Sequence, residues 1–294
     1  TQQAQHMTPD VLATLQQHLL QCLASPPSEV RRLLHGRGRC WPGLEQLTVD
    51  WLQGTLLVCL YRDPGAAALA ALQDSLHALT RQPQWTSSGA ERLLLQLRYL
   101  ADSPALWLHG TPVQQCQVSE QGLHYLLDLG SKQNNGLFLD MRLGRQWVRE
   151  QAAGRRVLNL FAYTCGFSVA ALAGGAQQVV NLDMARAALS RGRDNHRLNQ
   201  QDLSRVSFLG HDLFKSWGKL RKEGPFDLII IDPPTFQKGS FALTQDYQKI
   251  LRRLPELLNP GGQVLACVTA PDTGPAFLIQ GMAAEAPRRR FPER

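Results

Sequence analysis

The sequence of 294 residues is 44% apolar and 19% charged, with a net charge of +7. This is the composition of an ordinary soluble protein that is long enough for two domains. It has no run of eighteen apolar residues, no signal-peptide pattern at TQQAQHMTPD and no Cys or His spacing typical of zinc. A cytoplasmic protein without a membrane span or a structural zinc is therefore expected.

The first 130 residues predict an α+β domain with mostly antiparallel strands. Thr8-Pro9-Asp10 is a helix start, because it joins a capping hydroxyl, a proline in the first turn and an acid. A second short helix is expected after Ser28. The other predicted elements are two strands within 47–61 that turn at Gln53-Gly54, a helix over 66–79, a strand over 93–99 and a hairpin over 114–119 and 123–129 that turns at 120–122.

The segment RRLLHGRGR (31–39) combines four arginines with two glycines. Arginines on a glycine-rich turn can contact phosphates, and Arg37 and Arg39 are the candidates for contacting RNA. A solvated turn without a ligand is the alternative interpretation.

The polar segment GSKQNNG (130–136) predicts a boundary between an accessory domain over 1–130 and a second domain over 131–294. Residues 1–130 hold 8 Arg, no Lys and 10 acidic residues, a net charge of −2. Residues 131–294 therefore carry +9. A positive second half favours a polyanionic partner over a merely basic surface.

The second half alternates strands and helices. Strands are expected at 157–161, 179–182, 206–209, 227–231 and 263–268, and helices at 166–174, 184–198, 213–222 and 244–258. This order predicts an α/β fold with a parallel, doubly wound sheet, whose ligands bind at the carboxyl ends of the strands. No strand is predicted after Leu278.

Three acids end successive predicted strands: Asp183, Asp212 and Asp232. The loop after the first strand, FAYTCGF (161–167), has one glycine and no GxGxxG pattern, which disfavours a pyrophosphate-containing cofactor. A nucleoside cofactor needs no such pattern. Together the acids suit S-adenosylmethionine, which is cationic at sulfur, although each acid alone could simply cap a helix.

The segment FDLIIIDPPTF (226–236) predicts a buried strand that stops on Asp232. Pro233 and Pro234 have no N–H and fix φ, so the chain leaves the sheet in a rigid turn with outward-pointing carbonyls. With the ring of Phe236 this forms an acceptor-rich clamp. It suits a flat group that carries N–H donors, such as a nucleobase or an amide.

Five segments in order, NNGLFLDMR (134–142), LNLFAYTCGFS, NLDMARAAL, DNHRLN and IDPPTF, resemble the class I methyltransferases that modify bases of large-subunit ribosomal RNA, the RlmI- and RlmK-like group. The resemblance covers about residues 115–265. It implies a Rossmann-like methyltransferase sheet, S-adenosylmethionine as cofactor and RNA as substrate. The sheet of that family closes with an antiparallel strand pair.

By this resemblance Phe138 covers the cofactor and Arg142 pairs with its carboxylate. Asp140 either joins this site or caps a helix that begins at Met141. Asp183 with Met184 would hold the ribose. The resemblance places Asp212 and Leu213 beside the adenine, and Asn159, Phe161, Tyr163, Thr164, Cys165 and Gly166 around the methionine moiety.

Nitrogen is the favoured methyl acceptor. Asp232 and the Pro233 carbonyl can orient a nitrogen by accepting its protons, while Phe236 stacks on the base. Methylation at carbon-5 requires a cysteine adduct, but Thr269 stands where C5-methylating relatives carry their cysteine, and Cys267 is expected to be a core thiol. Lys238 and Arg252 are further candidates for contacting RNA.

Two alternatives stay open. The same clamp fits a protein glutamine amide, and the fold could serve a non-catalytic ribosome-assembly or RNA-binding factor. The intact Asp232-Pro233-Pro234 sequence disfavours the second. The sequence indicates no oligomeric state.

Overall fold

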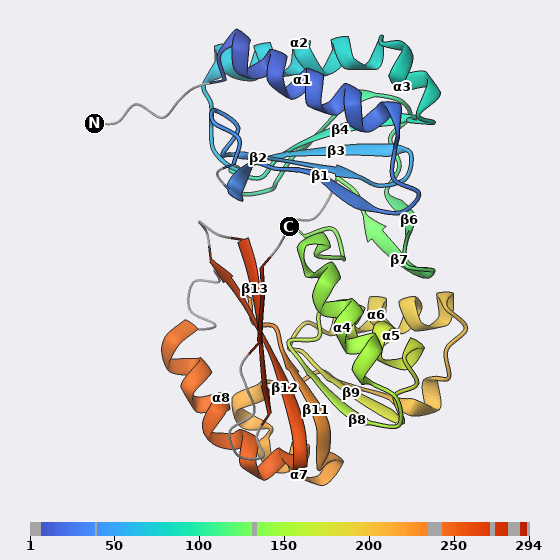
Figure 1. The fold of residues 1–294 in the computed structure, drawn as a ribbon, viewed down its shortest axis with the longest axis vertical. Coiled ribbons are helices and arrows are strands. Elements are labelled where there is room, and N and C mark those ends of the chain that lie inside the picture. Colours follow the sequence, from blue (N-terminus) through green and yellow to red (C-terminus); the bar gives the residue numbers. More distant parts are fainter. Residues whose placement is uncertain are drawn as a thin grey trace. The chain divides into compact units, whose positions relative to one another are not determined.

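The computed structural model of the protein describes residues 7–38, 40–130, 134–234, 243–270, 274–281 and 289–292. The chain divides into two compact units, each with its own sheet (Figure 1). Unit 1 holds the described residues of Thr1–Gly122 and Leu126–Asn135. Unit 2 holds Leu123–Tyr125 and the described residues of Gly136–Ala270 and Gly274–Arg294.

Unit 1 is a five-stranded sheet in the order β1-β2-β3-β4-β5, with its helices on one face (Figure 1). Only the β3–β4 pair is parallel among the described pairings of this sheet. The Thr8 hydroxyl accepts from the Val11 N–H at 3.3 Å, so the predicted cap of α1 is confirmed. The elements are α1 (Pro9–Ala24), β1 (Arg31–His35), a 3-10 turn η1 (Gly36–Gly38), β2 (Leu47–Trp51), β3 (Thr55–Leu60), α2 (Ala66–Thr80), α3 (Pro83–Ser87), β4 (Arg92–Leu97) and β5 (Ala105–His109).

The helix expected after Ser28 is wrong, because these residues form strand β1. Arg and Leu favour helices locally, but β1 gains backbone partners along β2 and buries Leu34 in the core. Across this pair the Arg32 Nε lies 2.9 Å from the Asp50 Oδ1. Tertiary pairing therefore overrides the local preference. Helix α3 and strand β5 were not predicted from the sequence.

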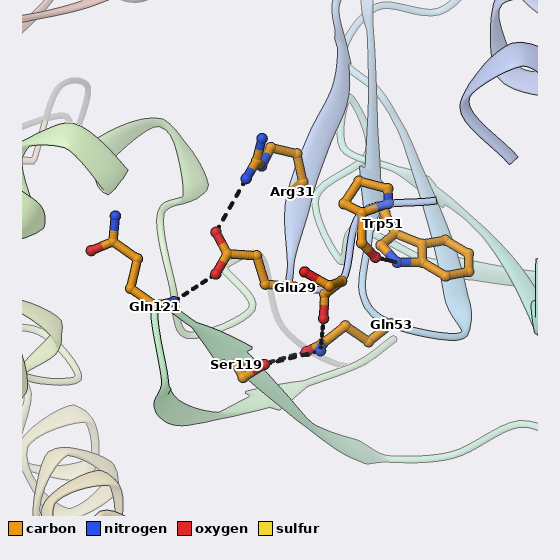
Figure 2. A network of polar contacts seen from close by, with 8 residues as sticks. Glu29, Arg31, Trp51, Gln53, Ser119 and Gln121 are labelled. Atoms are coloured by element: carbon orange, nitrogen blue, oxygen red, sulfur yellow. Dashed lines mark hydrogen bonds and ion pairs between the residues drawn. The ribbon is translucent and has the colours of Figure 1, made fainter. Parts of the chain in front are cut away.

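The predicted hairpin is present as β6 (Gln115–Glu120) and β7 (Leu123–Asp128). Its turn has positive φ at Gln121 (51°) and Gly122 (78°), as tight hairpin turns require. Polar contacts attach it to unit 1 (Figure 2). The Gln53 side chain accepts from the Ser119 N–H at 2.6 Å, and the Glu29 carboxylate accepts from the Gln121 N–H at 2.6 Å.

Unit 2 contains a seven-stranded sheet in the order β10-β9-β8-β11-β12-β13-β14. Its first five strands are parallel, which confirms the doubly wound α/β fold. The elements are η2 (Leu139–Met141), α4 (Arg142–Gln151), β8 (Arg156–Leu160), α5 (Gly166–Ala173), β9 (Gln178–Leu182), α6 (Arg186–Leu198), η3 (Leu203–Arg205), β10 (Val206–Leu209), η4 (Leu213–Lys215), α7 (Trp217–Glu223), β11 (Phe226–Ile231), α8 (Leu243–Leu257), β12 (Leu258–Ala270), β13 (Gly274–Gly281) and β14 (Arg289–Pro292).

The helices of unit 2 cover both faces of this sheet. Alternate strand residues such as Val157 and Ile230 pack with α4 and α5, while Leu158 and Ile231 pack with α7 and α8. Strands buried on both faces are mostly apolar, which is why the sequence revealed them as short apolar runs. The buried Asn159 and Asn181 are the polar exceptions in β8 and β9.

Two expectations for unit 2 are wrong. A strand pair does follow β12, since β13 and β14 pair antiparallel with Phe277 opposite Phe291. The helix expected over 213–222 is instead split into η4 and α7 at Ser216. Edge strands such as β14 are short and depend on distant partners, so local sequence indicates them poorly.

Candidate functional site

The carboxyl ends of the central strands bring two of the three predicted acids together. Leu160 of β8 pairs with both Leu182 of β9 and Ile231 of β11. The next residues along β9 and β11 are Asp183 and Asp232, so both leave the sheet at one level, on either side of β8. This is also where the strand order reverses, the usual ligand position of such sheets.

The loop that follows β8 is strained. Phe161, Tyr163 and Cys165 have φ of 57°, 51° and 66°, a left-handed conformation that costs a residue with a side chain roughly 1–2 kcal/mol. The Asp183 Oδ2 accepts from the Tyr163 N–H at 2.9 Å and helps to hold this conformation. Strained backbone of this kind clusters at ligand-binding sites.

Helix α6 supports the same loop from behind. The Asn195 side chain donates to the Thr164 carbonyl at 3.0 Å. A Cβ on Gly192 would lie 2.3 Å from the Cys165 Sγ, so only glycine fits there. Asn199 also donates to the His124 carbonyl at 2.8 Å. The DNHRLN segment therefore has a structural task, which is to position the loop.

A buried hydrogen-bond chain continues this support beneath the loop. Asn159 donates to Asn181 at 2.9 Å, and Asn181 donates to the Ser168 Oγ at 2.9 Å. The Ser168 Oγ lies 2.8 Å from the His196 Nε2, and the His196 Nδ1 lies 2.7 Å from the Gln201 Oε1. Since a carbonyl oxygen only accepts, the Nδ1 carries the proton and the Nε2 accepts from the Ser168 hydroxyl.

Two residues of this hydrogen-bond chain have properties that bear on the chemistry of the site. Burial lowers the pKa of His196 to about 4, so its ring is neutral near pH 7. The Asn159 Oδ1 is buried and has no hydrogen-bond partner among the described residues. Buried acceptors are nearly always satisfied, so a water or a ligand donor is expected at this oxygen.

A cavity of about 20 Å³ lies between the strained loop and the segment 136–141. This volume holds one water, far less than a nucleoside needs. The rings of Phe138 and Tyr163, with centroids 5.3 Å apart, belong to its lining. A nucleoside would therefore need more room than this cavity provides between the loop and the segment 136–141.

The cavity lining contains six predicted residues and six that the sequence analysis missed. The predicted ones are Phe138, Phe161, Tyr163, Thr164, Gly166 and Asp232. The missed ones are Gly136, Leu137, Met141, Arg145, Ala162 and Phe167. Most of the missed residues lie within or next to the segments 134–142 and 161–167. Taking all residues of these two segments and a few beyond them would have found them.

The cation of this cavity is Arg145, one turn after the predicted Arg142. Arg145 is only 4% exposed, lines the cavity and donates to the Phe138 carbonyl at 2.9 Å. Arg142 is not part of the lining. Arg145 is therefore a second candidate partner for a ligand carboxylate, beside the predicted Arg142.

Asp232 is half-buried, and its environment disfavours the charged form. Desolvation, and then the charge of Asp140, raise the pKa of Asp232 to about 7, while Arg145 opposes the shift. Asp140 does not cap a helix, since the residues at the cap positions of η2 and α4 are Phe138 and Met141. That alternative for Asp140 is wrong.

The other residues that were predicted to bind the nucleoside of the cofactor lie outside the cavity. The Asp183 Oδ1 accepts from the Ala185 N–H at 2.8 Å, and the neighbouring Met184 is 68% exposed. The Asp212 Oδ1 accepts from the Phe214 N–H at 3.0 Å, which confirms its capping role, and Leu213 is buried in the core. Each carboxylate oxygen keeps a second lone pair for a ligand.

Neither cysteine near the site is suited to act as a nucleophile. Cys165 and Cys267 are buried, and desolvation raises the pKa of each thiol. Nucleophilic cysteines need the thiolate form. Cys267 packs in the core beside Val157 and Ile230, as expected.

The remaining predicted site residues are scattered. Pro233 is buried and Pro234 half-buried after Asp232, Arg252 is exposed on α8, and Arg37 belongs to unit 1. Arg39, Phe236 and Lys238 lie outside the described residues. In the described part of the chain no His, Cys, Asp and Glu cluster has metal-binding geometry, and no helix is both long and apolar enough to cross a bilayer.

Two solved structures with similar folds are named as putative methyltransferases. "A putative sam-dependent methyltransferase from Streptococcus mutans" superposes with a TM-score of 0.75 at 26% identity, covering 89% of this chain and 67% of that one. The crystal structure of SMU.776 complexed with SAH gives the same TM-score and identity, covering 92% and 70%.

Sequence relatives and a family model agree with this. The chain is 39% identical over 163 residues to Ribosomal RNA large subunit methyltransferase I of Aeromonas salmonicida, which is 54% of this chain and 41% of that relative. The value is also 39%, over 173 residues, for the protein of the same name from Serratia proteamaculans, with coverages of 58% and 43%. The matches thus span less than half the length of these curated relatives. Because a model described as S-adenosylmethionine-dependent methyltransferase matches residues 31–294, the chain belongs to that family.

Proposed function

We propose that this protein transfers a methyl group from S-adenosylmethionine to a nitrogen of an RNA base, in large-subunit ribosomal RNA. The observation that carries the proposal is the position of Asp232, next to the cavity at the strand-order reversal and followed by two prolines. The names of the sequence relatives support the choice of RNA. The charge of +9 on residues 131–294 supports it as well.

The residues at the sheet edge suit the cofactor. The free lone pairs of Asp183 can accept from the ribose hydroxyls, and the exposed Met184 beside it offers an apolar face to the adenine. Arg145 can pair with the carboxylate of the methionine end, and the orphan Asn159 Oδ1 can accept from its amine. When bound, the cofactor supplies an electrophilic methyl group.

Asp232 is the proposed catalytic residue. Its carboxylate would accept an N–H of the target base and so aim the nitrogen lone pair, with help from the Pro233 carbonyl. A pKa of about 7 also lets Asp232 take up the proton that the methylated nitrogen loses. Pro234 would keep this corner rigid.

Nitrogen is preferred over carbon-5 because of the thiols. Carbon-5 methylation needs a thiolate that adds to the pyrimidine ring. Both Cys165 and Cys267 are buried, and the pKa of each thiol is raised. Outside the described residues, Phe236 keeps its proposed stacking role and Lys238 its proposed phosphate contact. Arg252 on α8 is exposed for a similar contact.

Calorimetry with the cofactor tests the first half of the proposal. Asp183→Ala should weaken binding at least tenfold, because it removes both the ribose acceptor and the Tyr163 contact. Asp202→Ala is the matched control. This exposed acid lies just before β10, at the amino ends of the parallel strands, and therefore far from the cofactor site at their carboxyl ends. Equal affinities of wild type and Asp183→Ala would refute the assignment of the cofactor site.

Nucleoside mass spectrometry tests the second half. Ribosomal RNA from a deletion strain should lack one methylated base, and the purified protein should restore it with labelled cofactor. An unchanged set of RNA marks would refute the proposed RNA substrate. Label appearing on a protein glutamine instead would identify the amide as the acceptor.

A further inference from the structure

Unit 1 contains an arginine and tyrosine cluster that the methyl-transfer site does not use. The guanidinium carbon of Arg37 lies 4.2 Å from the centroid of the Tyr61 ring, and that of Arg98 lies 5.3 Å from it. The sequence pointed to Arg37 through its glycine-rich segment, but Tyr61 and Arg98 are far away in sequence. We call these three residues the Arg–Tyr cluster.

The topology of unit 1 places this cluster at one edge of the sheet. Leu60 of β3 and Leu97 of β4 are paired residues of parallel strands, so Tyr61 and Arg98 leave the sheet side by side. The Arg98 N–H donates to the Leu60 carbonyl at 2.8 Å and fixes this level. Strand β1 runs in the same direction as β3, so η1 brings Arg37 to the same edge. Carboxyl ends of parallel strands are frequent ligand positions.

The backbone that carries Arg37 is held tightly. A Cβ on Gly36 would lie 1.8 Å from the Leu44 carbonyl oxygen. No residue with a side chain therefore fits at this position. Arg37 itself is exposed. A fixed backbone beneath an exposed guanidinium reduces the entropy lost when the side chain binds a ligand.

Donors of the cluster remain unused. Arg37 has no hydrogen-bond or ion-pair partner among the described residues. The Nη2 of Arg98 donates to Asn134 at 3.3 Å, while its buried Nε has no hydrogen-bond partner in the described part of the chain. The exposed guanidinium of Arg37 therefore keeps its N–H donors for an external acceptor.

The nearby carboxylates are already engaged. Asp50 accepts from Arg32 through both oxygens, at 2.9 and 3.4 Å. The Asp63 Oδ1 accepts from the Gly65 N–H at 2.9 Å. The guanidinium groups of the Arg–Tyr cluster are therefore not neutralised by an ion pair with either acid, and an external anion is favoured there.

We propose that the Arg–Tyr cluster binds a backbone phosphate of the RNA substrate. A guanidinium presents two parallel N–H donors that match phosphate oxygens, and stacking on Tyr61 holds its plane. Such contacts position an RNA without reading its sequence. The inference rests on the proposed function, because it takes RNA as the substrate, and it gives unit 1 the task of holding that RNA.

Fluorescence anisotropy of the full chain with a labelled single-stranded RNA 20-mer, at several salt concentrations, tests the site. Arg37→Gln and Arg98→Gln should each weaken binding about three- to tenfold. Each should also reduce the slope of log affinity against log salt by about 0.7, the value for one lost phosphate contact on single strands. Arg98→Lys, which keeps the charge but loses the planar fork, should weaken binding at an unchanged slope.

Arg81→Gln is the matched control. Arg81 is exposed and lies at the C-terminal end of α2. Because α2 connects the carboxyl end of β3 with the amino end of the parallel β4, Arg81 lies at the opposite end of these strands from the Arg–Tyr cluster. Arg81→Gln therefore removes the same charge far from the cluster. Its affinity and slope should equal those of the wild type. Circular dichroism and urea unfolding of each variant show whether unit 1, which holds both arginines, is folded. The exposed Arg37 keeps the test valid if Arg98→Gln unfolds.

The outcomes separate the two proposals. If both Arg→Gln variants bind RNA like the wild type at every salt concentration, the cluster is not a phosphate site, although the methyltransferase proposal stands. If the wild type binds cofactor but no RNA, the RNA substrate itself is refuted, and this inference with it. Full competition by 10 mM inorganic phosphate, roughly physiological in concentration, would indicate a free-phosphate site and overturn the inference.

Discussion

Replacing Asp232 by Asn should make the protein more stable and less active at the same time. The change removes the charge at nearly constant volume. The folded environment raises the pKa of Asp232 from 3.8 to about 7, mainly by desolvation and secondly through Asp140. The folded state therefore binds this proton more tightly than the unfolded state does.

The sign of the pH dependence follows from this shift. A raised pKa in the folded state contributes stability below pH 3.8, and that contribution is lost as the pH rises through about 7. The full shift corresponds to roughly 4 kcal/mol. Because Asp232 is half-buried and partly screened by solvent, we expect about 2 kcal/mol. Asp232→Asn should thus raise the free energy of unfolding by this amount at pH 8 and leave it nearly unchanged at pH 4.

Activity should move in the opposite direction. Only the ionised carboxylate can accept from the target nitrogen, so the wild-type kcat/KM should rise with pH and level off above about 7. Asp232→Asn should lower kcat by at least about 100-fold, the usual size of a lost general base. Urea unfolding between pH 4 and 8, and single-turnover transfer to ribosomal RNA, measure the two effects.

Asp202→Asn provides the control. This exposed acid caps η3, and Asn caps a helix equally well, so neither stability nor activity should change much. Two results would refute the reasoning. A loss of stability in Asp232→Asn at pH 8 would show that the folded state favours the carboxylate, and an unchanged pH–rate profile would remove Asp232 from catalysis.

Two further predictions concern the support of the loop 161–166. Burial lowers the pKa of His196 from 6.5 to about 4, so the stability present above pH 6.5 should be lost as the pH falls toward 4, by about 2 kcal/mol at pH 5. In urea unfolding, His196→Gln should remove this dependence of the free energy of unfolding on pH. The same pH dependence in the variant and the wild type would show that His196 is not its source. Gly192→Ala should weaken cofactor binding about tenfold in calorimetry, because its Cβ would press on Cys165. Gly218→Ala is the control, because a Cβ on this helical glycine would only touch the Arg221 Nη2 at an ordinary 3.6 Å. It should leave the cofactor affinity unchanged, and a similar loss of affinity would disprove the steric reason.

Local sequence predicted the centre of the unit 2 sheet well because β8, β9 and β11 are buried on both faces along most of their length. Such strands are mostly apolar, and acids mark where β9 and β11 stop. The run that ends on Asp232 shows this: Phe226–Ile231 is the strand β11, and the acid is the first residue beyond it. The same logic located Asp183 at the end of β9.

Elements that depend on distant partners were not predictable in this way. Strand β1 has residues that favour helices, and only its pairing with β2 decides the outcome. The family resemblance singled out Arg142, whereas the arginine in the cavity lining is Arg145. Which arginine lines the cavity depends on how α4 packs against the loop, and local sequence does not reveal that packing.

The missing glycine pattern has a physical explanation in α6. Many nucleotide-binding loops obtain their left-handed backbone from glycine, but here Phe161, Tyr163 and Cys165 adopt it against a steric cost. The cost is offset from outside the loop, by the bond from Asn195 and by the close contact that Gly192 permits. Since side chains then occupy the loop, they can line the cavity that glycines would leave bare. The loop is consequently a wall of the site whose backbone is fixed from α6 and whose side chains face the cavity.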